Sequence, residues 1–141
     1  IYKSIKGDAL PLDNGGNASR DFIFVEDMAN GLIACALNGI SGQAYNLASG
    51  VETSIYDLAM MINSATGNTT PVELKPARDW DNSGKRFGST EKSKREIKFE
   101  ASTPIFNGIK ETVFWTKHNI NIIEQKISQH DIFMRKYLET R

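Results

Sequence analysis

Apolar residues recur at helical spacing in several segments of the chain, and capping or turn residues bound each of these segments. The spacing predicts helices over residues 28–38, 55–66, 104–115 and 120–138. A short charged helix is predicted over residues 90–97, and residues 1–6 are typical of the end of a helix that stops at Gly7. We expect the first long helix to face a core with Met28, Leu32, Ala36, Ala29, Ile33 and Leu37.

Short apolar runs between these helices predict a few strands. The runs lie at residues 10–12, 22–25, 42–47 and 71–74, and polar loops are expected at residues 13–19 and 78–88. Asp27 is expected to cap the helix that follows the second run, and Ser102 or Thr103 the helix that starts at Pro104. Helices that alternate with a few short strands indicate an α/β fold.

The chain has 141 residues, which suits one domain with a core of its own. It carries 17 Lys and Arg against 17 Asp and Glu, so no net charge attracts nucleic acid or an acidic membrane surface. It contains no run of 18 apolar residues, and a single cysteine fits a reducing compartment. We expect a cytoplasmic location, no nucleic-acid or membrane partner, and, because the chain starts at Ile1 without Met or a visible signal peptide, a fragment.

The chain shows none of the usual motifs of a catalytic centre. Cys35, His118 and His130 lack the spacing of metal ligands, and no Gly-x-Ser-x-Gly elbow is present. The Gly-x-Gly-x-x-Gly spacing of a dinucleotide loop is also absent. Tyr2 and Lys6 match Tyr-x-x-x-Lys, but only one residue precedes Tyr2, so we favour a chance match. We therefore predict no catalytic, metal or cofactor residues in this chain.

Arg20 is the first candidate for ligand binding, because it lies between a Gly/Asn-rich turn and an apolar run that fix its backbone. A fixed guanidinium can bind phosphate or carboxylate through two parallel hydrogen bonds. Arg78 and Arg86, in the loop after residue 75, can supply a second cation. For each arginine an ion pair with a nearby aspartate or glutamate is the alternative, and local sequence does not decide between the two.

Four motifs in order resemble the C-terminal half of the NAD-dependent epimerase/dehydratase family, the extended short-chain dehydrogenases that act on nucleotide sugars and include UDP-glucose 4-epimerase. These motifs are Arg20-Asp21-Phe22-x-x-Val25-x-Asp27-Met28, Gly42-Gln43-Ala44-Tyr45-Asn46-Leu47-Ala48-Ser49-Gly50, Arg78-x-x-Asp81, and Thr90 to Phe99. The resemblance runs from about residue 7 to residue 115. It implies a substrate-binding lobe over residues 1–115, followed by a helical extension over residues 116–141.

The resemblance also implies roles for individual residues. Arg20 corresponds to an arginine that holds a nucleotide-sugar phosphate, and Arg78 to one that holds the diphosphate from the other side. The segment Leu10, Pro11 and Leu12 corresponds to one that lies along the base. Because the loop around Arg78 differs from that of many relatives, Arg86 can take its role instead. Ser89 replaces a common aspartate, and Ile97-Lys98-Phe99 replaces a common Leu-Gly-Trp.

The same resemblance implies a longer parent enzyme, whose N-terminal Rossmann domain binds NAD and carries the catalytic residues. This chain then supplies the binding of a UDP- or dTDP-hexose, most like a 4-epimerase, and is expected to bind no NAD and to be inactive alone. The alternative is a non-catalytic binding or self-association module whose arginines lie in surface ion pairs. We expect a homo-oligomer, because the 42–47 run would be a strand with an unpaired edge.

Overall fold

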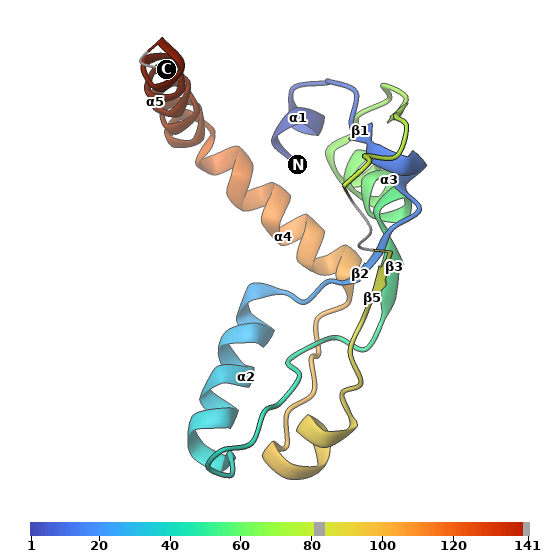
Figure 1. The fold of residues 1–141 in the computed structure, drawn as a ribbon, viewed down its shortest axis with the longest axis vertical. Helices are drawn as coiled ribbons and strands as arrows, with labels where there is room; N and C mark the ends of the chain where they lie inside the picture. The colour runs from blue at the N-terminus through green and yellow to red at the C-terminus, as the bar shows by residue number, and fades with distance from the viewer. Residues whose placement is uncertain (81–83, 140–141) are drawn as a thin grey trace.

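The computed structural model describes the backbone of residues 1–80 and 84–139, and the side chains of those residues up to residue 134 (Figure 1). The elements follow one another along the chain as α1 (Tyr2–Ile5), β1 (Pro11–Leu12), the 3-10 helix η1 (Asp13–Gly16), β2 (Ser19–Asp21), α2 (Val25–Asn38), β3 (Glu52–Ser54), α3 (Ile55–Thr66), β4 (Glu73–Leu74), β5 (Lys85–Arg86), the π-helix η2 (Ser93–Ile97), α4 (Ile105–His118) and α5 (Ile120–Glu139). Several helices with a few short strands confirm the predicted α/β class.

The strands form two small sheets. In the larger sheet β2 lies in the middle, antiparallel to β3 and parallel to β5. In the smaller sheet β1 pairs in parallel with β4. Both parallel partners come from the segment after α3, so this segment returns beside the start of the chain and brings residues 85–86 next to residues 19–20.

Helix α3 shows most directly how local sequence sets an element. The Ser54 side chain accepts a hydrogen bond from the backbone N–H of Asp57 at 2.9 Å, which satisfies a donor that the first turn leaves unpaired. The helix ends at Gly67, whose φ of 77° is left-handed and suits glycine. One cluster of buried residues lies between α3 and the smaller sheet, where Leu10 and Leu12 pack against Ala59; Ile97, Phe99, Ile109 and Val113 are buried as well.

Two predicted strands are wrong. Residues 22–24 are not in a strand, because β2 ends at Asp21 and Val25 already begins α2. Residues 42–47 form no strand either, and within the described chain no neighbouring strand pairs with them. An apolar run is equally compatible with a buried strand and with an irregular segment, since a strand also needs a partner for its backbone.

The predicted helix caps at Asp27 and at residues 102–103 are also wrong. Helix α2 begins two residues before Asp27, and α4 begins at Ile105 after Pro104 without a side-chain cap. The two predicted caps instead bind one another: Asp27 accepts hydrogen bonds from Ser102 and Thr103. Capping residues have short polar side chains that can also bond a backbone far away in sequence, and here the distant backbone is the partner.

The predicted core face of α2 is largely exposed in this chain. Leu32, Ile33 and Leu37 are 60%, 57% and 77% exposed, whereas Gly31 packs against Leu47 and Phe99. Figure 1 shows α2 and η2 side by side at one end of the molecule, with α5 at the other end. Within the described part of the chain, α2 is therefore covered on the side of Gly31 and η2, while Leu32, Ile33 and Leu37 remain exposed.

Candidate functional site

Arg20 occupies the middle position of β2, the central strand of the larger sheet. Its Nη1 atom donates hydrogen bonds to the carbonyl oxygens of Ser19 at 2.6 Å and Gly84 at 2.8 Å. The side chain is half-buried, so its position is fixed both by the sheet and by these bonds. The sequence interpretation of Arg20 as a cation with a fixed backbone agrees with its place in the strand.

The register of the sheet brings Arg20 and Arg86 together. Arg20 is paired with Thr53 on one side and with Arg86 on the other. Side chains of register partners project from the same face of a sheet, because successive residues alternate between the two faces. At these strand positions one face of the sheet therefore carries two guanidinium groups and a threonine, with no carboxylate among them.

The opposite face of the same sheet carries a mixed-charge group. Glu52 accepts a hydrogen bond from the Ser19 hydroxyl at 2.6 Å and lies 3.5 Å from the Lys85 ammonium. The Ser19 hydrogen bond, with Lys85 nearby, lowers the pKa of Glu52 below its usual value, although partial burial opposes the shift. The charges of Glu52 and Lys85 are thus balanced away from the arginine face.

Arg78 lies in a separate small cavity of about 110 Å³. Its guanidinium forms an ion pair with Asp13 and lies over the Trp80 ring, 5.2 Å from the centroid. Of the alternatives drawn from sequence, an ion pair is therefore present, but its acceptor is Asp13 and is 65 residues away. Asp81, the last residue of the Arg78-x-x-Asp81 motif, lies outside the described residues.

Gly84 connects the two arginine sites. Gly84 lines the cavity that Arg78 also lines, and the Gly84 carbonyl accepts the hydrogen bond from Arg20. Lys85, the next residue, lines the same cavity and begins β5, which carries Arg86. The structure thus pairs Arg20 with Arg86 in the sheet, whereas Arg78 is linked to them only through the cavity that it shares with Gly84 and Lys85.

The segment of residues 10–12 divides into buried and exposed side chains. Leu10 and Leu12 are 9% and 3% exposed and belong to the core, whereas Pro11 is exposed. Their backbone pairs with β4. Of the side chains in this segment, only that of Pro11 is therefore exposed enough to contact a ligand, while Leu10 and Leu12 pack in the core.

Asp21 binds a turn that the sequence did not connect with it. One carboxylate oxygen accepts hydrogen bonds from the Ser49 N–H at 2.8 Å and the Ser49 hydroxyl at 2.6 Å, and the other accepts from the Gly50 N–H at 2.8 Å. These bonds hold residues 49–50 just before β3, and so fix the pairing of β3 with Arg20. No local pattern identifies this partner, because it lies 28 residues away.

Asp27 forms a second carboxylate clamp and is 5% exposed. It accepts hydrogen bonds from Ser102 N–H at 3.2 Å, the Ser102 hydroxyl at 3.1 Å and Thr103 N–H at 2.9 Å. Burial alone would raise the pKa of Asp27, but the bonds from Thr103 and Ser102 outweigh it and lower the pKa below the usual aspartate value. The clamp ties the start of α2 to the start of α4.

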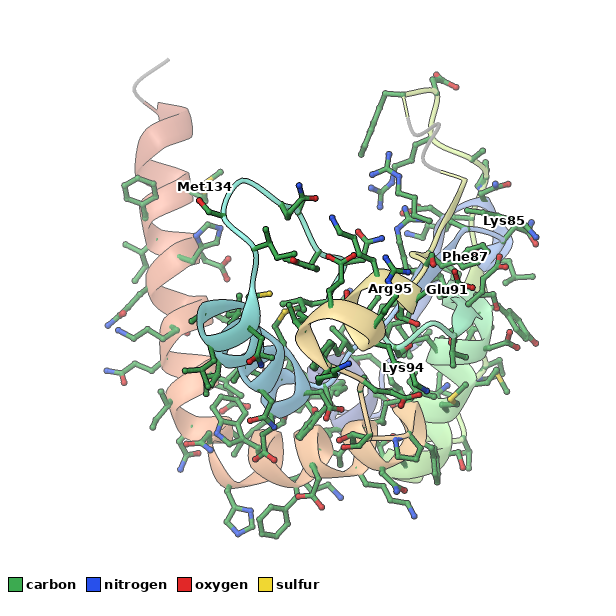
Figure 2. The ribbon with its side chains drawn as sticks, turned by 90° about the horizontal axis from the view of Figure 1, so that it is seen from below. Lys85, Phe87, Glu91, Lys94, Arg95 and Met134 are labelled. Carbon is green, nitrogen blue, oxygen red and sulfur yellow. The ribbon has the colours of Figure 1, made fainter. Side chains whose placement is uncertain are left out.

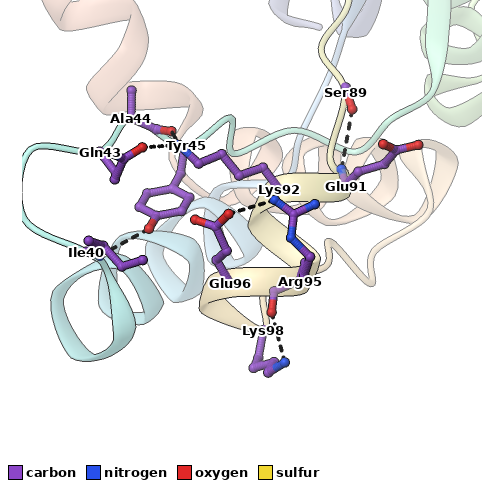
Figure 3. Close-up of polar contacts among 10 residues, drawn as sticks. All are labelled: Ile40, Gln43, Ala44, Tyr45, Ser89, Glu91, Lys92, Arg95, Glu96 and Lys98. Atoms are coloured by element: carbon purple, nitrogen blue, oxygen red, sulfur yellow. Dashed lines mark hydrogen bonds and ion pairs between the residues drawn. The ribbon is translucent and has the colours of Figure 1, made fainter.

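Lys92 holds the irregular segment that follows α2 (Figure 3). Its ammonium donates to the Gln43 side-chain oxygen at 2.8 Å and to the Ala44 carbonyl at 3.0 Å, and lies 4.8 Å from the centre of the Tyr45 ring. The Tyr45 hydroxyl accepts a hydrogen bond from the Ile40 N–H at 3.1 Å. Side-chain contacts of Lys92, the residue before η2, thus hold residues 43–45 in place of strand pairing.

Replacing Lys92 by methionine is expected to loosen this segment selectively. The change keeps most of the aliphatic stem and removes two hydrogen bonds and a cation–π contact, which together stabilise by about 1–2 kcal/mol. Hydrogen exchange of the Ile40 and Gln43 amides, which donate to the Tyr45 hydroxyl and the Ile40 carbonyl, should then be faster by roughly tenfold. Lys98→Met is the control, since Lys98 donates only to the nearby Arg95 carbonyl; equal protection in both variants would contradict this role for Lys92.

An apolar groove of about 680 Å³ lies between residues 22–26, α3 and α4. Phe24, Ile109 and Trp115 are among its lining residues. Trp115 is 59% exposed and neighbouring Phe114 is 62% exposed. The groove is apolar and lies on a different part of the chain from the arginine face.

Tyr2 and Lys6, whose match to Tyr-x-x-x-Lys is attributed to chance on sequence grounds, take part in contacts with the last helix. Tyr2 and Lys6 both contact Glu124 of α5, through a 3.4 Å hydrogen bond from the Tyr2 hydroxyl and an ion pair from Lys6. Among the described residues, no group of three or more His, Cys, Asp or Glu side chains is placed to hold a metal ion. In the same part of the chain, no helix is long and apolar enough to cross a membrane.

Comparison with known proteins finds nucleotide-sugar epimerases and dehydratases among the relatives of this chain. The chain is 30% identical over 121 residues to UDP-glucose 4-epimerase GEPI42 of Cyamopsis tetragonoloba, covering 82% of this chain and 34% of that protein. It is 27% identical over 131 residues to dTDP-glucose 4,6-dehydratase of Shigella flexneri, covering 88% and 36%. This chain is a homologue of nucleotide-sugar epimerases and dehydratases. The resemblance inferred from its four motifs is thereby confirmed.

Solved structures that are similar to this epimerase/dehydratase homologue are enzymes of the same kind. The Bordetella bronchiseptica enzyme WbmF, in complex with NAD+ and UDP, is 55% identical with a TM-score of 0.82, and the match covers 92% of this chain and 38% of WbmF. The epimerase Mth375 of Methanothermobacter thermautotrophicus is 32% identical with a TM-score of 0.83, and the match covers 88% and 37%. No protein-family model matches the chain.

The epimerase/dehydratase homologue spans little more than a third of the length of these relatives. Helix α4 continues through residue 115, where the predicted lobe ends, and stops at His118. The division into a lobe and an extension stays a prediction.

Proposed function

We propose that this chain is the nucleotide-sugar-binding part of an NAD-dependent epimerase or dehydratase, most like a 4-epimerase, and that it is inactive by itself. The observation that carries the proposal is the sheet face on which Arg20 and Arg86 are register partners. Two guanidinium groups at adjacent strand positions can bind the diphosphate of a UDP- or dTDP-hexose, the class of ligand named for several relatives.

Arg78 supplies the second side of this proposed site. Because the cavity around it shares Gly84 with Arg20, a diphosphate bound at the arginine face can reach Arg78 as well. The ion pair with Asp13 keeps the guanidinium in place until phosphate oxygens compete for it. Of the residue pair that sequence left open, we propose Arg86 as the nearer partner of Arg20 and Arg78 as the outer ligand, with Pro11 available to the base.

In this proposal the rest of the parent enzyme supplies the chemistry. A Rossmann domain would bind NAD and carry the catalytic groups, while binding of the nucleotide part by this chain positions the sugar for reaction. The exposed apolar side chains of α2, together with the unpaired segment 42–47, are the surface that we expect this domain to cover. Relatives more than twice as long as the chain, some with NAD bound, support a domain of that kind and an NAD-dependent parent. A cytoplasmic location of the parent is part of the proposal.

The alternative is a binding or self-association module in which the arginines form ion pairs only. For Arg78, the ion pair with Asp13 favours this alternative. For Arg20 and Arg86 the register of the sheet supports the phosphate site, because it places their two side chains on the same face.

Calorimetry with UDP tests the proposed site. Arg86→Ala should weaken UDP binding by roughly 10- to 100-fold, because one charge-assisted interaction contributes about 1.5–3 kcal/mol. Arg78→Ala should weaken it by a smaller factor, since Arg78 lies at the outer side. Arg95→Ala is the control, because Arg95 is an exposed arginine paired with the adjacent Glu96.

The outcomes separate the two functions. Unchanged UDP binding in both Arg86→Ala and Arg78→Ala would support the ion-pair module and contradict the phosphate site. Arg20→Lys serves as a further variant because Arg20→Ala also removes the hydrogen bond to the Gly84 carbonyl. Turnover of UDP-glucose by the isolated chain with added NAD would contradict the proposed division of labour.

A further inference from the structure

Helix α5 extends well beyond its contacts with the body of the chain. Its beginning is held by Glu124, which pairs with Lys6 and accepts a hydrogen bond from Tyr2. The helix then continues to Glu139, 15 residues further along the chain. Figure 1 shows α5 at the end of the molecule opposite α2, and Figure 2 shows Met134 on its distal half.

The side chains on this helix follow the spacing of a coiled-coil seam. Ile120, Ile123, Ile127, His130 and Met134 are separated by three, four, three and four residues, which assigns them alternately to the a and d positions of a heptad. Ile120 and Ile123 are half-buried, whereas Ile127 and Met134 are 41% and 38% exposed and His130 is exposed. The distal half of the seam is therefore uncovered among the described residues.

The charges beside the seam select one arrangement of two helices. In this heptad Lys126 is at g and Asp131 is at the following e position. In a parallel pair, the g position of one helix lies against the following e position of its partner. Lys126 of each copy therefore faces Asp131 of the other copy, which gives two such pairs by symmetry. An antiparallel pair brings g against g and e against e, which places lysine near lysine and aspartate near aspartate.

We propose that α5 is a dimerisation helix, and that its occupant is α5 of a second copy of this chain, in a parallel, two-stranded coiled coil through Ile123, Ile127, His130 and Met134. This interface lies outside the arginine face and does not depend on the proposed function.

His130 makes the proposed dimer weak and fixes its register. It occupies a d position, where a polar side chain lowers stability but disfavours shifted pairings. His130→Leu should therefore lower the dissociation constant of the dimer, by roughly tenfold if about 1.4 kcal/mol is gained. The seam is short as well, so we expect self-association that depends on concentration.

Sedimentation equilibrium of the whole chain tests the proposal. Ile127→Lys should raise the dissociation constant at least about tenfold, because it places two ammonium groups in the seam. Ile132→Lys is the matched control: Ile132 is 57% exposed on the same helix but lies at position f, away from the seam. A monomeric wild type at millimolar concentration, or equal effects of the two substitutions, would overturn the proposal.

Two further variants test the parallel orientation. Lys126→Glu should weaken the dimer, and adding Asp131→Lys should restore it by reversing each pair. In a Cys35→Ser background, His130→Cys should form an intermolecular disulfide on oxidation, because equivalent d positions meet only in a parallel pair. Association without this cross-link, and without rescue by charge reversal, would show that another surface joins the copies.

Discussion

Replacing Asp27 by alanine should lower the free energy of unfolding by about 3–4 kcal/mol, the largest effect we expect from a single substitution. The change leaves two backbone N–H groups and the Ser102 hydroxyl without their acceptor, and each unsatisfied buried group costs about 1–3 kcal/mol. Urea denaturation followed by circular dichroism measures the change. The control is Glu26→Ala in the same helical turn, where the side chain is exposed and the expected loss is about 0.5 kcal/mol.

The contribution of Asp27 should also depend on pH. Because the folded-state pKa of Asp27 is lowered, its stabilising effect is fully present above the unfolded-state value near 4 and is lost as the pH falls through the folded pKa. The stability difference between wild type and Asp27→Asn should be constant from about pH 7 to 5 and should shrink below about pH 4. A difference that shrinks between pH 7 and 5 would contradict the lowered pKa.

Gly16→Ala should have the second largest effect, a loss of about 3 kcal/mol in the free energy of unfolding. Gly16 has a φ of 76°, and a Cβ atom there would lie 2.8 Å from the backbone nitrogen of Tyr56, at the start of α3. The left-handed conformation costs a non-glycine residue roughly 1–2 kcal/mol, and the clash with a backbone atom adds to this because the helix must shift.

Gly7→Ala separates these two contributions. Gly7 has a similar φ of 80°, but no atom lies within 4 Å of the position of an added Cβ. Its substitution should therefore cost only about 1–2 kcal/mol, the conformational part alone. If the two variants lose the same stability in thermal or chemical unfolding, the close approach of η1 to α3 contributes nothing measurable.

The helices were the part of the fold that the sequence predicted best. The periodicity of residues 55–66, with a capping serine before and a glycine after, specifies α3 without reference to any other element. Helix α5 and the end of α2 at Asn38 are confirmed for the same reason. Helical hydrogen bonds are local, so local sequence contains the information that forms them.

The strands were predicted less well because their bonds are not local. Ser19-Arg20-Asp21 is polar and gave no strand signal, yet it is the central strand of the larger sheet because β3 and β5 both pair with it. Residues 42–47 carry a strand-like run and have no strand partner within the described chain. A strand exists only where a second backbone accepts and donates its hydrogen bonds, and local sequence does not contain that partner.

For the candidate site, too, the sequence predicted some features and the tertiary structure decided others. The sequence by itself determined that Arg20, Arg78 and Arg86 are the cations to consider, and its ordered motifs identified the homologous enzymes. Only the tertiary structure decided that Arg86 is the register partner of Arg20 and that Arg78 pairs with Asp13. Partner choice between guanidinium and carboxylate groups depends on distances across the folded chain, because an ion pair needs proximity in space whatever the separation in sequence.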